Sequence, residues 1–340
     1  MEKLFWIFYK TRRISIDSRT IEKDSLFIAL KGDRFDGNLY AEKAIEAGAK
    51  FAIVEDKSIS NEINIFWVEN SLLYLQKLAN FHRSKFKIPI IGITGSNGKT
   101  STKELMNCVL SRKYYVLCTK GNLNNHLGVP LTLLQLNDKH ELAIIEMGAN
   151  KPGDIKELAE IAEPNYGIIT NIGKAHLEGF INFEGVLKTK LELFDFISSS
   201  EGEFIVNADD EILNNATKNY SSRVLYSSKV KTEIEGKLEG LTPFVALSYK
   251  TENYESPCIK TNMIGNYNFY NFLVAITFGQ IFKVSNNEIN KAIVININAV
   301  LLFFLLNGYK YKIKINISKI GGKSAQCHNK CPFSPIVIFK

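Results

Sequence analysis

The chain has 340 residues, 45% of them hydrophobic and 23% charged, so it is long enough for two or three soluble domains with sizeable cores. Its net charge of +7 resides in residues 296–340, which contain seven lysines and no acidic residue. Residues 1–295 are therefore neutral overall, which leaves no electrostatic case for a nucleic-acid partner. The apolar run at residues 299–306 is too short to span a bilayer, and the five cysteines show no framework spacing, so we expect a cytoplasmic protein without membrane insertion.

The first 85 residues alternate short apolar runs with helical patterns, which is typical of a small α/β domain. We expect strands over residues 26–30 and Phe51–Val54, with a helix over residues 41–47 between them. A second helix is predicted over Ser71–Arg83, with its first residue as the N-cap. The basic run at residues 83–87 predicts a linker into the next domain.

From residue 90 onward, short β-rich apolar segments alternate with helical stretches. The predicted strands are Ile90–Thr94, Leu142–Glu146, residues 167–170 and residues 204–207, and the predicted helices are residues 100–112, 153–162 and 183–196. Fully apolar strands separated by helices indicate a parallel sheet buried on both faces. Ligands of such sheets gather beyond the carboxyl ends of the strands, where the motifs described next are found.

A glycine-rich segment, residues 95–101 (Gly-Ser-Asn-Gly-Lys-Thr-Ser), follows a predicted strand and opens a predicted helix. Such a turn directs several backbone N–H groups at one anion, aided by the helix dipole. We expect Lys99 to reach the β- and γ-phosphates of a nucleotide and the Thr100 hydroxyl to ligate Mg²⁺. The strict Walker pattern has glycine where Ile93 stands, so the loop is a variant, and a chance glycine turn is the alternative.

Two polar residues at predicted strand ends are suited to a metal. Glu146 ends an apolar strand, and His176 follows the strand end at residues 170–175. At the ligand-bearing edge of a parallel sheet, such side chains can bind Mg²⁺ between nucleotide and substrate, although each alone is typical of an ordinary surface residue. Lys190 lies in the predicted helix that follows, and its surroundings are those of a solvated surface lysine.

Together these segments resemble the Mur ligase family, and within it the MurF type, over residues 14–293. The motifs that carry the resemblance are residues 16–19 (Ile-Asp-Ser-Arg), 26–32, 36–38, 94–100, 121–130, 144–150, 170–176 and 265–268 with Asn271. Asn38 and Tyr267 stand where the family often has histidine. The resemblance implies an α/β architecture with a small N-terminal substrate domain (residues 1–85) and a central parallel-sheet P-loop ATPase domain (residues 86–295).

The resemblance also implies ATP-dependent ligation of D-alanyl-D-alanine to UDP-N-acetylmuramoyl-tripeptide, through an acyl phosphate, in the synthesis of peptidoglycan precursor. It implies ATP and two Mg²⁺ ions as cofactors and a monomeric enzyme. Two alternatives stay open: a truncated nucleotide-binding remnant without turnover, and another Mur-type ligase that adds a diamino acid.

By the same resemblance, four kinds of site residue are expected. The catalytic residues are Lys99, Glu146, His176 and Lys190. The ATP-binding residues are Thr94, Gly95, Ser96, Asn97, Gly98, Lys99, Thr100, Ser101, Asn268 and Asn271. The substrate-binding residues are Ser18 and Arg19 for the UDP-linked substrate and Asn124 and Asn125 near the peptide carboxylate. The metal ligands are Thr100, Glu146, His176 and Lys190, the last as a carbamate.

Residues 296–340 depart from the family pattern, because they lack acidic residues and show no sustained period. The third, C-terminal ligase domain of the family is thus expected to be missing, since 45 residues cannot build it. We expect a reading-frame shift near residues 293–298 and a poorly ordered tail. A divergent C-terminal extension with a function of its own is the alternative.

Overall fold

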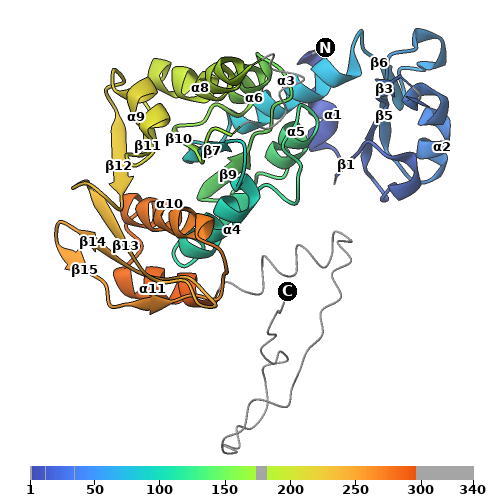
Figure 1. Cartoon of the computed structure of the whole chain (residues 1–340). Coiled ribbons are helices and arrows are strands. Elements are labelled where there is room, and N and C mark those ends of the chain that lie inside the picture. Colours follow the sequence, from blue (N-terminus) through green and yellow to red (C-terminus); the bar gives the residue numbers. More distant parts are fainter. Residues whose placement is uncertain (1, 12, 34, 174–181, 296–340) are drawn as a thin grey trace, which may run out of the picture. The chain divides into compact units, whose positions relative to one another are not determined.

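The computed structural model describes residues 2–11, 13–33, 35–173 and 182–295 (Figure 1). The expectations for His176 and for residues 296–340 concern residues outside these ranges and stay predictions. Within the described ranges, no helix has the length and apolar character needed to cross a membrane.

A four-stranded parallel sheet forms the N-terminal part of the chain, in the order β1-β2-β5-β6. Its strands are β1 (Ile14–Ser15), β2 (Leu26–Ile28), β5 (Phe51–Val54) and β6 (Ile65–Trp67), and a small hairpin pairs β3 (Lys31–Gly32) with β4 (Phe35–Asp36). The helices here are η1 (Glu2–Leu4), α1 (Trp6–Tyr9), η2 (Ser18–Thr20), η3 (Gly37–Tyr40), α2 (Ala41–Glu46), η4 (Lys57–Ile59) and α3 (Ser71–Arg83). The predicted strands and helices of this region are confirmed, with ends shifted by at most two residues.

A ten-stranded sheet follows, in the order β15-β14-β13-β12-β11-β10-β7-β9-β8, with β16 paired to β14. Its strands are β7 (Ile90–Thr94), β8 (Val116–Cys118), β9 (Leu142–Glu146), β10 (Tyr166–Ile169), β11 (Glu203–Asn207), β12 (Arg223–Ser227), β13 (Ile234–Gly240), β14 (Ala246–Thr251), β15 (Tyr254–Glu255) and β16 (Ile259–Lys260). Neighbours from β8 to β13 are parallel, and the pairs formed by β14 are antiparallel. The predicted parallel sheet is therefore confirmed, with an antiparallel extension that no pattern predicted.

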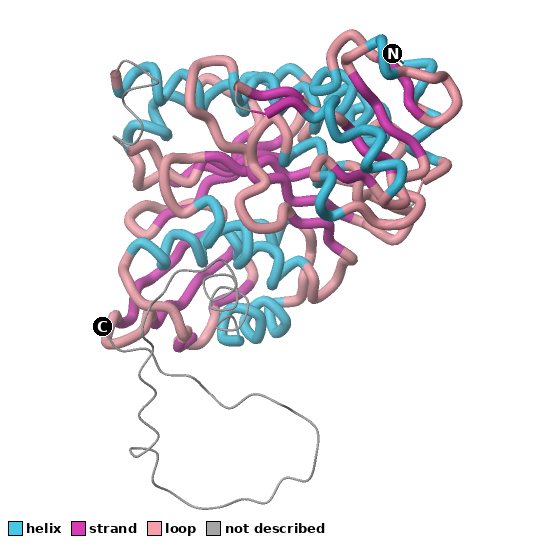
Figure 2. Tube along the Cα trace, turned by 90° about the vertical axis from the view of Figure 1, so that its right-hand side faces the viewer, coloured by secondary structure: helices cyan, strands magenta, loops and turns pink. Residues whose placement is uncertain are grey.

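Helices cover both faces of the parallel strands (Figure 2). They are α4 (Lys99–Leu110), α5 (Gly128–Leu133), α6 (Asp154–Ala162), α8 (Phe183–Ser199), α9 (Glu211–Thr217), α10 (Tyr267–Ile281) and α11 (Asn286–Ile295). Successive strand residues enter different cores: Ile90 packs in the core formed with α3, α5, α6 and α8, whereas Ile91 packs in the core formed with α4, α10 and α11. This alternation is why the strands are apolar throughout.

Helix α10 has no amphipathic pattern from which it could be predicted. Phe272, Leu273, Val274 and Ala275 are successive residues that point in four different directions around the helix, yet all are buried. A helix that is apolar all round lies in the interior of a large domain. Its sequence has no polar face, so the helical period of 3.6 residues cannot be recognised from it.

The N-cap of helix α3 lies one residue earlier than predicted. The prediction of Ser71 as N-cap is wrong, because the Asn70 side chain accepts the bond from the Leu73 N–H while Ser71 is the first helical residue. An extended backbone at Asn70 orients its side chain for this bond, and asparagine is among the strongest capping residues.

The basic run at residues 83–87 is more than a linker, because Arg83 is buried. Its guanidinium donates to the backbone oxygens of Ala162 (2.9 Å), Glu163 (3.0 Å) and Phe86 (2.9 Å). Arg83 thus joins the end of α3 to the carboxyl end of α6. A planar fork of donors is suited to several carbonyls at once.

We expect Arg83→Met to lower the free energy of unfolding by about 3 kcal/mol, because one buried and two partly buried carbonyls lose charge-assisted donors. Urea unfolding measures this. Arg13→Met is the matched control: Arg13 is exposed and paired with Glu22, and its loss should cost less than about 1 kcal/mol. Equal losses in the two variants would contradict the structural role of Arg83.

Candidate functional site

The glycine-rich turn between β7 and α4 has a backbone that only glycine adopts easily. Gly95 has φ +142° and Gly98 has φ +78°, and Gly98 is the residue that precedes α4. A Cβ atom at Gly95 would lie 2.0 Å from Thr170 Oγ1. Both the dihedral angles and the close approach therefore require glycine, and the turn presents its N–H groups at the start of a helix.

The segment after β10 braces this turn. Thr170 Oγ1 donates to Asn97 O at 2.6 Å, and Asn171 Oδ1 accepts from Asn97 N at 3.1 Å. Ser96 Oγ accepts from Gly173 N at 2.9 Å. Two motifs that lie some seventy residues apart in the sequence are thereby held together at one edge of the sheet.

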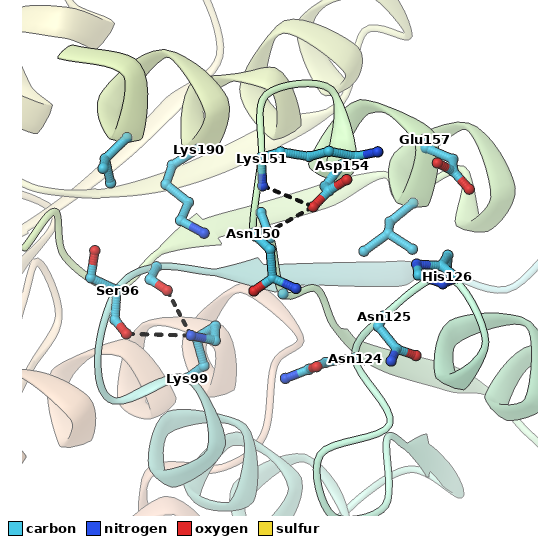
Figure 3. A pocket seen from close by; sticks show the side chains of 15 residues that line it. Ser96, Lys99, Asn124, Asn125, His126, Asn150, Lys151, Asp154, Glu157 and Lys190 are labelled. Atoms are coloured by element: carbon cyan, nitrogen blue, oxygen red, sulfur yellow. Dashed lines mark hydrogen bonds between the residues drawn. The ribbon is translucent and has the colours of Figure 1, made fainter. Parts of the chain in front are cut away.

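Lys99 folds back over the turn that precedes it. Its ammonium donates to Gly95 O at 2.7 Å and lies 3.4 Å from Ser96 O (Figure 3). Burial lowers the pKa of Lys99, and the nearby Glu146 carboxylate opposes that shift. The turn thus holds a cation among its own carbonyls.

Glu146 ends β9 as a buried carboxylate with several partners. Thr100 Oγ1 lies 3.2 and 3.1 Å from its two oxygens, and Asn124 Nδ2 donates to Oε1 at 2.8 Å. Lys103 Nζ lies 3.7 Å from Oε2. Two of the predicted metal ligands, Thr100 and Glu146, are thus in direct contact, and the predicted substrate residue Asn124 joins them.

Lys103 was not predicted as part of this site. It is fully buried on α4, and its ammonium donates to Thr119 O (2.5 Å) and Gly121 O (3.2 Å) and pairs with Glu104 (3.0 Å). A lysine one helical turn beyond Lys99 is ordinary in sequence. Only the packing of α4 against the strand ends shows that it is buried.

A cavity of about 510 Å³ lies beside the turn. Its lining residues are Gly95, Ser96, Lys99, Asn124, Asn125, His126, Gly148, Ala149, Asn150, Lys151, Asp154, Glu157, Leu158, Val186 and Lys190. In Figure 3, Lys99 and Lys190 reach in from one side and Asn124 and Asn125 line the other. Asn125 also caps α5, because its Oδ1 accepts from Leu127 N (3.1 Å) and Gly128 N (2.9 Å).

Lys190 projects from α8 into this cavity and is itself largely buried. Burial and, after it, the positive charge of Lys99 lower its pKa to about 8, while Asp154 and Glu192 oppose the shift. A lysine with this pKa has a substantial neutral fraction near pH 8. Lys190 is therefore a desolvated side chain, not the solvated surface lysine that its sequence position indicates.

Asn268 and Asn271 lie outside the lining of the cavity. Thr102 Oγ1 donates to Asn271 Oδ1 (3.0 Å), Asn271 Nδ2 donates to Asn268 Oδ1 (2.9 Å), and Asn268 Nδ2 donates to Ile264 O (2.7 Å). Both asparagines are buried, and this chain of bonds joins α10 to α4. Asn271 also packs against Gly98, so it supports the turn from behind.

Ser18 and Arg19 lie in η2, in the N-terminal part of the chain, and do not line the cavity either. The Arg19 side chain is 86% exposed and donates to both carboxylate oxygens of Asp17. These hydrogen bonds lower the pKa of Asp17 to about 2. The guanidinium is thus oriented by a neighbour but still open to solvent.

Comparison with known families decides the affiliation. A model described as "Mur ligase middle domain" matches residues 93–279, and one described as "Mur ligase family, catalytic domain" matches residues 10–82. The chain belongs to the Mur ligase family. The first match contains the glycine-rich turn, Glu146 and Lys190, and the second contains Ser18 and Arg19.

Curated relatives of this Mur ligase chain include two enzymes named UDP-N-acetylmuramoyl-tripeptide–D-alanyl-D-alanine ligase. The one from Bacillus subtilis is 33% identical over 288 residues, covering 82% of this chain and 61% of the relative. The one from Escherichia coli is 37% identical over 217 residues, covering 64% of this chain and 46% of the relative. The chain thus spans about half to three fifths of the length of these relatives.

Solved structures agree with this Mur ligase fold. A crystal structure of MurF from Acinetobacter baumannii superposes with a TM-score of 0.77 at 31% identity, covering 86% of this chain and 67% of that one. MurF from Thermotoga maritima, solved in complex with ADP, gives a TM-score of 0.75 at 28% identity, covering 84% and 66%. The match confirms the predicted α/β fold class.

We expect Gly95→Ala to lower the free energy of unfolding by about 1–3 kcal/mol and to weaken ATP binding, because the added Cβ meets Thr170 in a strained backbone. Gly153→Ala is the control: Gly153 has φ +90° but open space around its Cβ, so it isolates the dihedral strain. Thermal unfolding and calorimetric ATP titration measure both effects. A Gly95 variant that matches the Gly153 variant in both would disprove the close-approach argument.

Proposed function

We propose that the chain carries the substrate-binding and nucleotide-binding parts of a MurF-type ligase. In this reaction ATP drives the addition of D-alanyl-D-alanine to UDP-N-acetylmuramoyl-tripeptide through an acyl phosphate. The observation that supports the proposal most strongly is the cavity, in which the phosphate turn, the asparagine pair and Lys190 meet. The names of the relatives and structures with at least 28% identity point to the same reaction.

The phosphates of ATP would be held by Lys99 and by N–H groups of the turn other than those of Ser96 and Asn97, which donate to Asn171. Attack of a carboxylate on a phosphate brings two anions together, and the Lys99 ammonium at the turn offsets that repulsion. The Ser101 side chain and the buried Thr94 flank this cradle along the chain. Asn268 and Asn271 would support α4 behind the glycine-rich turn, through their hydrogen bonds with Thr102 and with each other.

The donor set at the end of β9 fits Mg²⁺. Glu146 and Thr100 offer carboxylate and hydroxyl oxygens in contact with each other, which are the hard ligands that this ion prefers. Bound there, Mg²⁺ would supply charge neutralisation at the transferred phosphoryl group. His176, the other predicted ligand, lies outside the described residues.

Lys190 is proposed to act as a carbamate. Addition of CO₂ to the neutral amine forms an N–C bond and releases one proton, which converts a cationic side chain into an anion. Its lowered pKa supplies the neutral amine that this reaction needs. The resulting carboxylate would lie near Lys99 and could ligate a second Mg²⁺.

Asn124 and Asn125 are proposed to hold the peptide carboxylate near the phosphates, because both line the cavity opposite the two lysines. Ser18 and Arg19 are proposed to bind the UDP part of the substrate. A guanidinium that is exposed and held in a fixed orientation by Asp17 can still donate to a phosphate. We further propose a division into a substrate domain at residues 1–85 and an ATP domain at residues 86–295.

Phosphate release from ATP in the presence of UDP-N-acetylmuramoyl-tripeptide separates the candidate functions. Release that depends on D-alanyl-D-alanine supports the MurF-type ligase, and release that depends on a diamino acid with the shorter UDP-dipeptide supports the other Mur type. Nucleotide binding without either response would indicate a binding remnant.

We expect Lys99→Ala to weaken ATP binding by about tenfold or more, since a charge-assisted contact to the phosphates is lost. Isothermal titration calorimetry measures the affinity, and circular dichroism checks that the fold persists. Lys156→Ala is the control, because Lys156 is an exposed lysine on α6. An unchanged affinity in the Lys99 variant would remove this lysine from the phosphate site.

At constant dissolved CO₂, carbamate formation at Lys190 should rise more steeply with pH below about pH 8 than above it, because below the lowered pKa the ammonium must lose a proton before CO₂ can add. The carbamate carbonyl signal from ¹³C-labelled CO₂, measured by NMR at constant dissolved CO₂, reports it. Lys190→Ala should lose the signal, and the exposed neighbour Lys188→Ala should keep it. A steep rise that continues up to the pKa of an ordinary lysine, about 10.4, would contradict the prediction.

A further inference from the structure

Lys103 is an ammonium that the proposed chemistry does not use, although it lies next to the proposed metal site. An ammonium has three N–H donors, and the carbonyl oxygens of Thr119 and Gly121 and the Glu104 carboxylate can accept all three. Lys103 Nζ lies 3.7 Å from Glu146 Oε2, so it interacts with this carboxylate mainly through its charge and not through a hydrogen bond. The buried ammonium is held in place by these partners and cannot leave without breaking several bonds.

The charges around Glu146 balance without a metal. Among the described residues, the Glu104 and Glu146 carboxylates are matched by the Lys103 and Lys99 ammonium groups. Mg²⁺ entering alone would add two positive charges to this mostly buried, balanced cluster. Mg²⁺ entering with a triphosphate brings net negative charge, which the same lysines favour.

We propose that Lys103 is a built-in counter-cation of Glu146 that makes metal binding at this carboxylate conditional on the nucleotide. The inference rests on the proposed assignment of Glu146 as a Mg²⁺ ligand. Lys103 acts here as a positioning residue. It holds the backbone of residues 119–121 against α4, keeps the carboxylate compensated when no metal is bound, and opposes a metal that arrives without phosphates.

The first test needs no variant at position 103. In the 340-residue chain without nucleotide, millimolar Mg²⁺ should leave the Tm unchanged, whereas Mg²⁺ with ATP should raise it above the value with ATP alone. Glu146→Gln should abolish that additional rise. A rise with Mg²⁺ alone that disappears in Glu146→Gln would overturn the proposal, because it would show that the metal needs no nucleotide.

The second test removes the counter-cation. Lys103→Met keeps the length of the side chain without the charge. Its apparent Kd for Mg²⁺ without nucleotide should fall about tenfold or more, because a buried positive charge 3.7 Å from the Glu146 carboxylate no longer opposes the metal. Mg²⁺ alone should then raise the Tm of this variant. Lys103→Arg, which keeps the charge, should behave like the wild type, and Lys103→Met/Glu146→Gln should lose the gain.

Lys113→Met is the matched control. Lys113 also donates to two backbone carbonyls, those of Phe282 (3.2 Å) and Lys283 (3.0 Å), but has no contact with Glu146. The Lys113→Met variant tests the structural effect of removing a lysine that binds two backbone carbonyls. This variant should not gain a rise in Tm with Mg²⁺ alone. A Lys103→Met variant whose Mg²⁺ response equals that of Lys113→Met would overturn the proposal.

The outcomes separate this inference from the proposed function. If Glu146→Gln leaves the effect of Mg²⁺ with ATP intact, the assignment of Glu146 as a ligand fails. If that effect is lost but Mg²⁺ alone binds equally well to the wild type and to Lys103→Met, only the role of Lys103 fails.

Discussion

The candidate site depends on the contacts that compensate the buried carboxylate of Glu146. An ionised group inside a protein must be compensated, and here the compensation comes from Thr100 and Lys103 on α4 and from Asn124 on the loop after β8. One charge at a strand end therefore fixes the positions of a helix and a loop that are distant in sequence. The helix carries the phosphate turn, and the loop carries one wall of the cavity.

The doubly covered parallel sheet explains why these groups can meet at all. Strands β7, β8, β9 and β10 are parallel neighbours, so the segments that follow them emerge at the same edge. The turn at residues 95–98 comes from β7, the loop with Asn124 from β8 and the bracing segment at residues 170–173 from β10. Each is short, and each is held by bonds to its neighbours rather than by its own secondary structure.

Basic side chains at this edge of the sheet are in a different electrostatic environment from basic side chains at the surface. Lys99 and Lys190 are buried near each other, and desolvation together with mutual repulsion shifts the pKa of Lys190 toward the range in which its amine is neutral. Arg19, by contrast, remains exposed and is matched by Asp17 alone. Basic side chains thus have a lowered pKa in one place and remain solvated cations in another, because their burial differs.

The sequence by itself determined strands β7 and β9 and the glycine-rich turn, since Ile90–Thr94 and Leu142–Glu146 are uniformly apolar and the glycines at 95 and 98 meet a local backbone requirement. The family motifs also singled out Asn124 and Lys190, which line the cavity. What only the tertiary structure decided is the burial of Lys103 and Arg83, the Asn70 cap, helix α10 and the supporting position of Asn268 and Asn271. The local sequence pattern indicates the secondary-structure period of a segment and the backbone dihedral angles that it requires. Burial and hydrogen-bond partners, in contrast, depend on segments that are far away in the chain. The sequence around a helical lysine does not indicate whether that lysine faces water or a buried carboxylate.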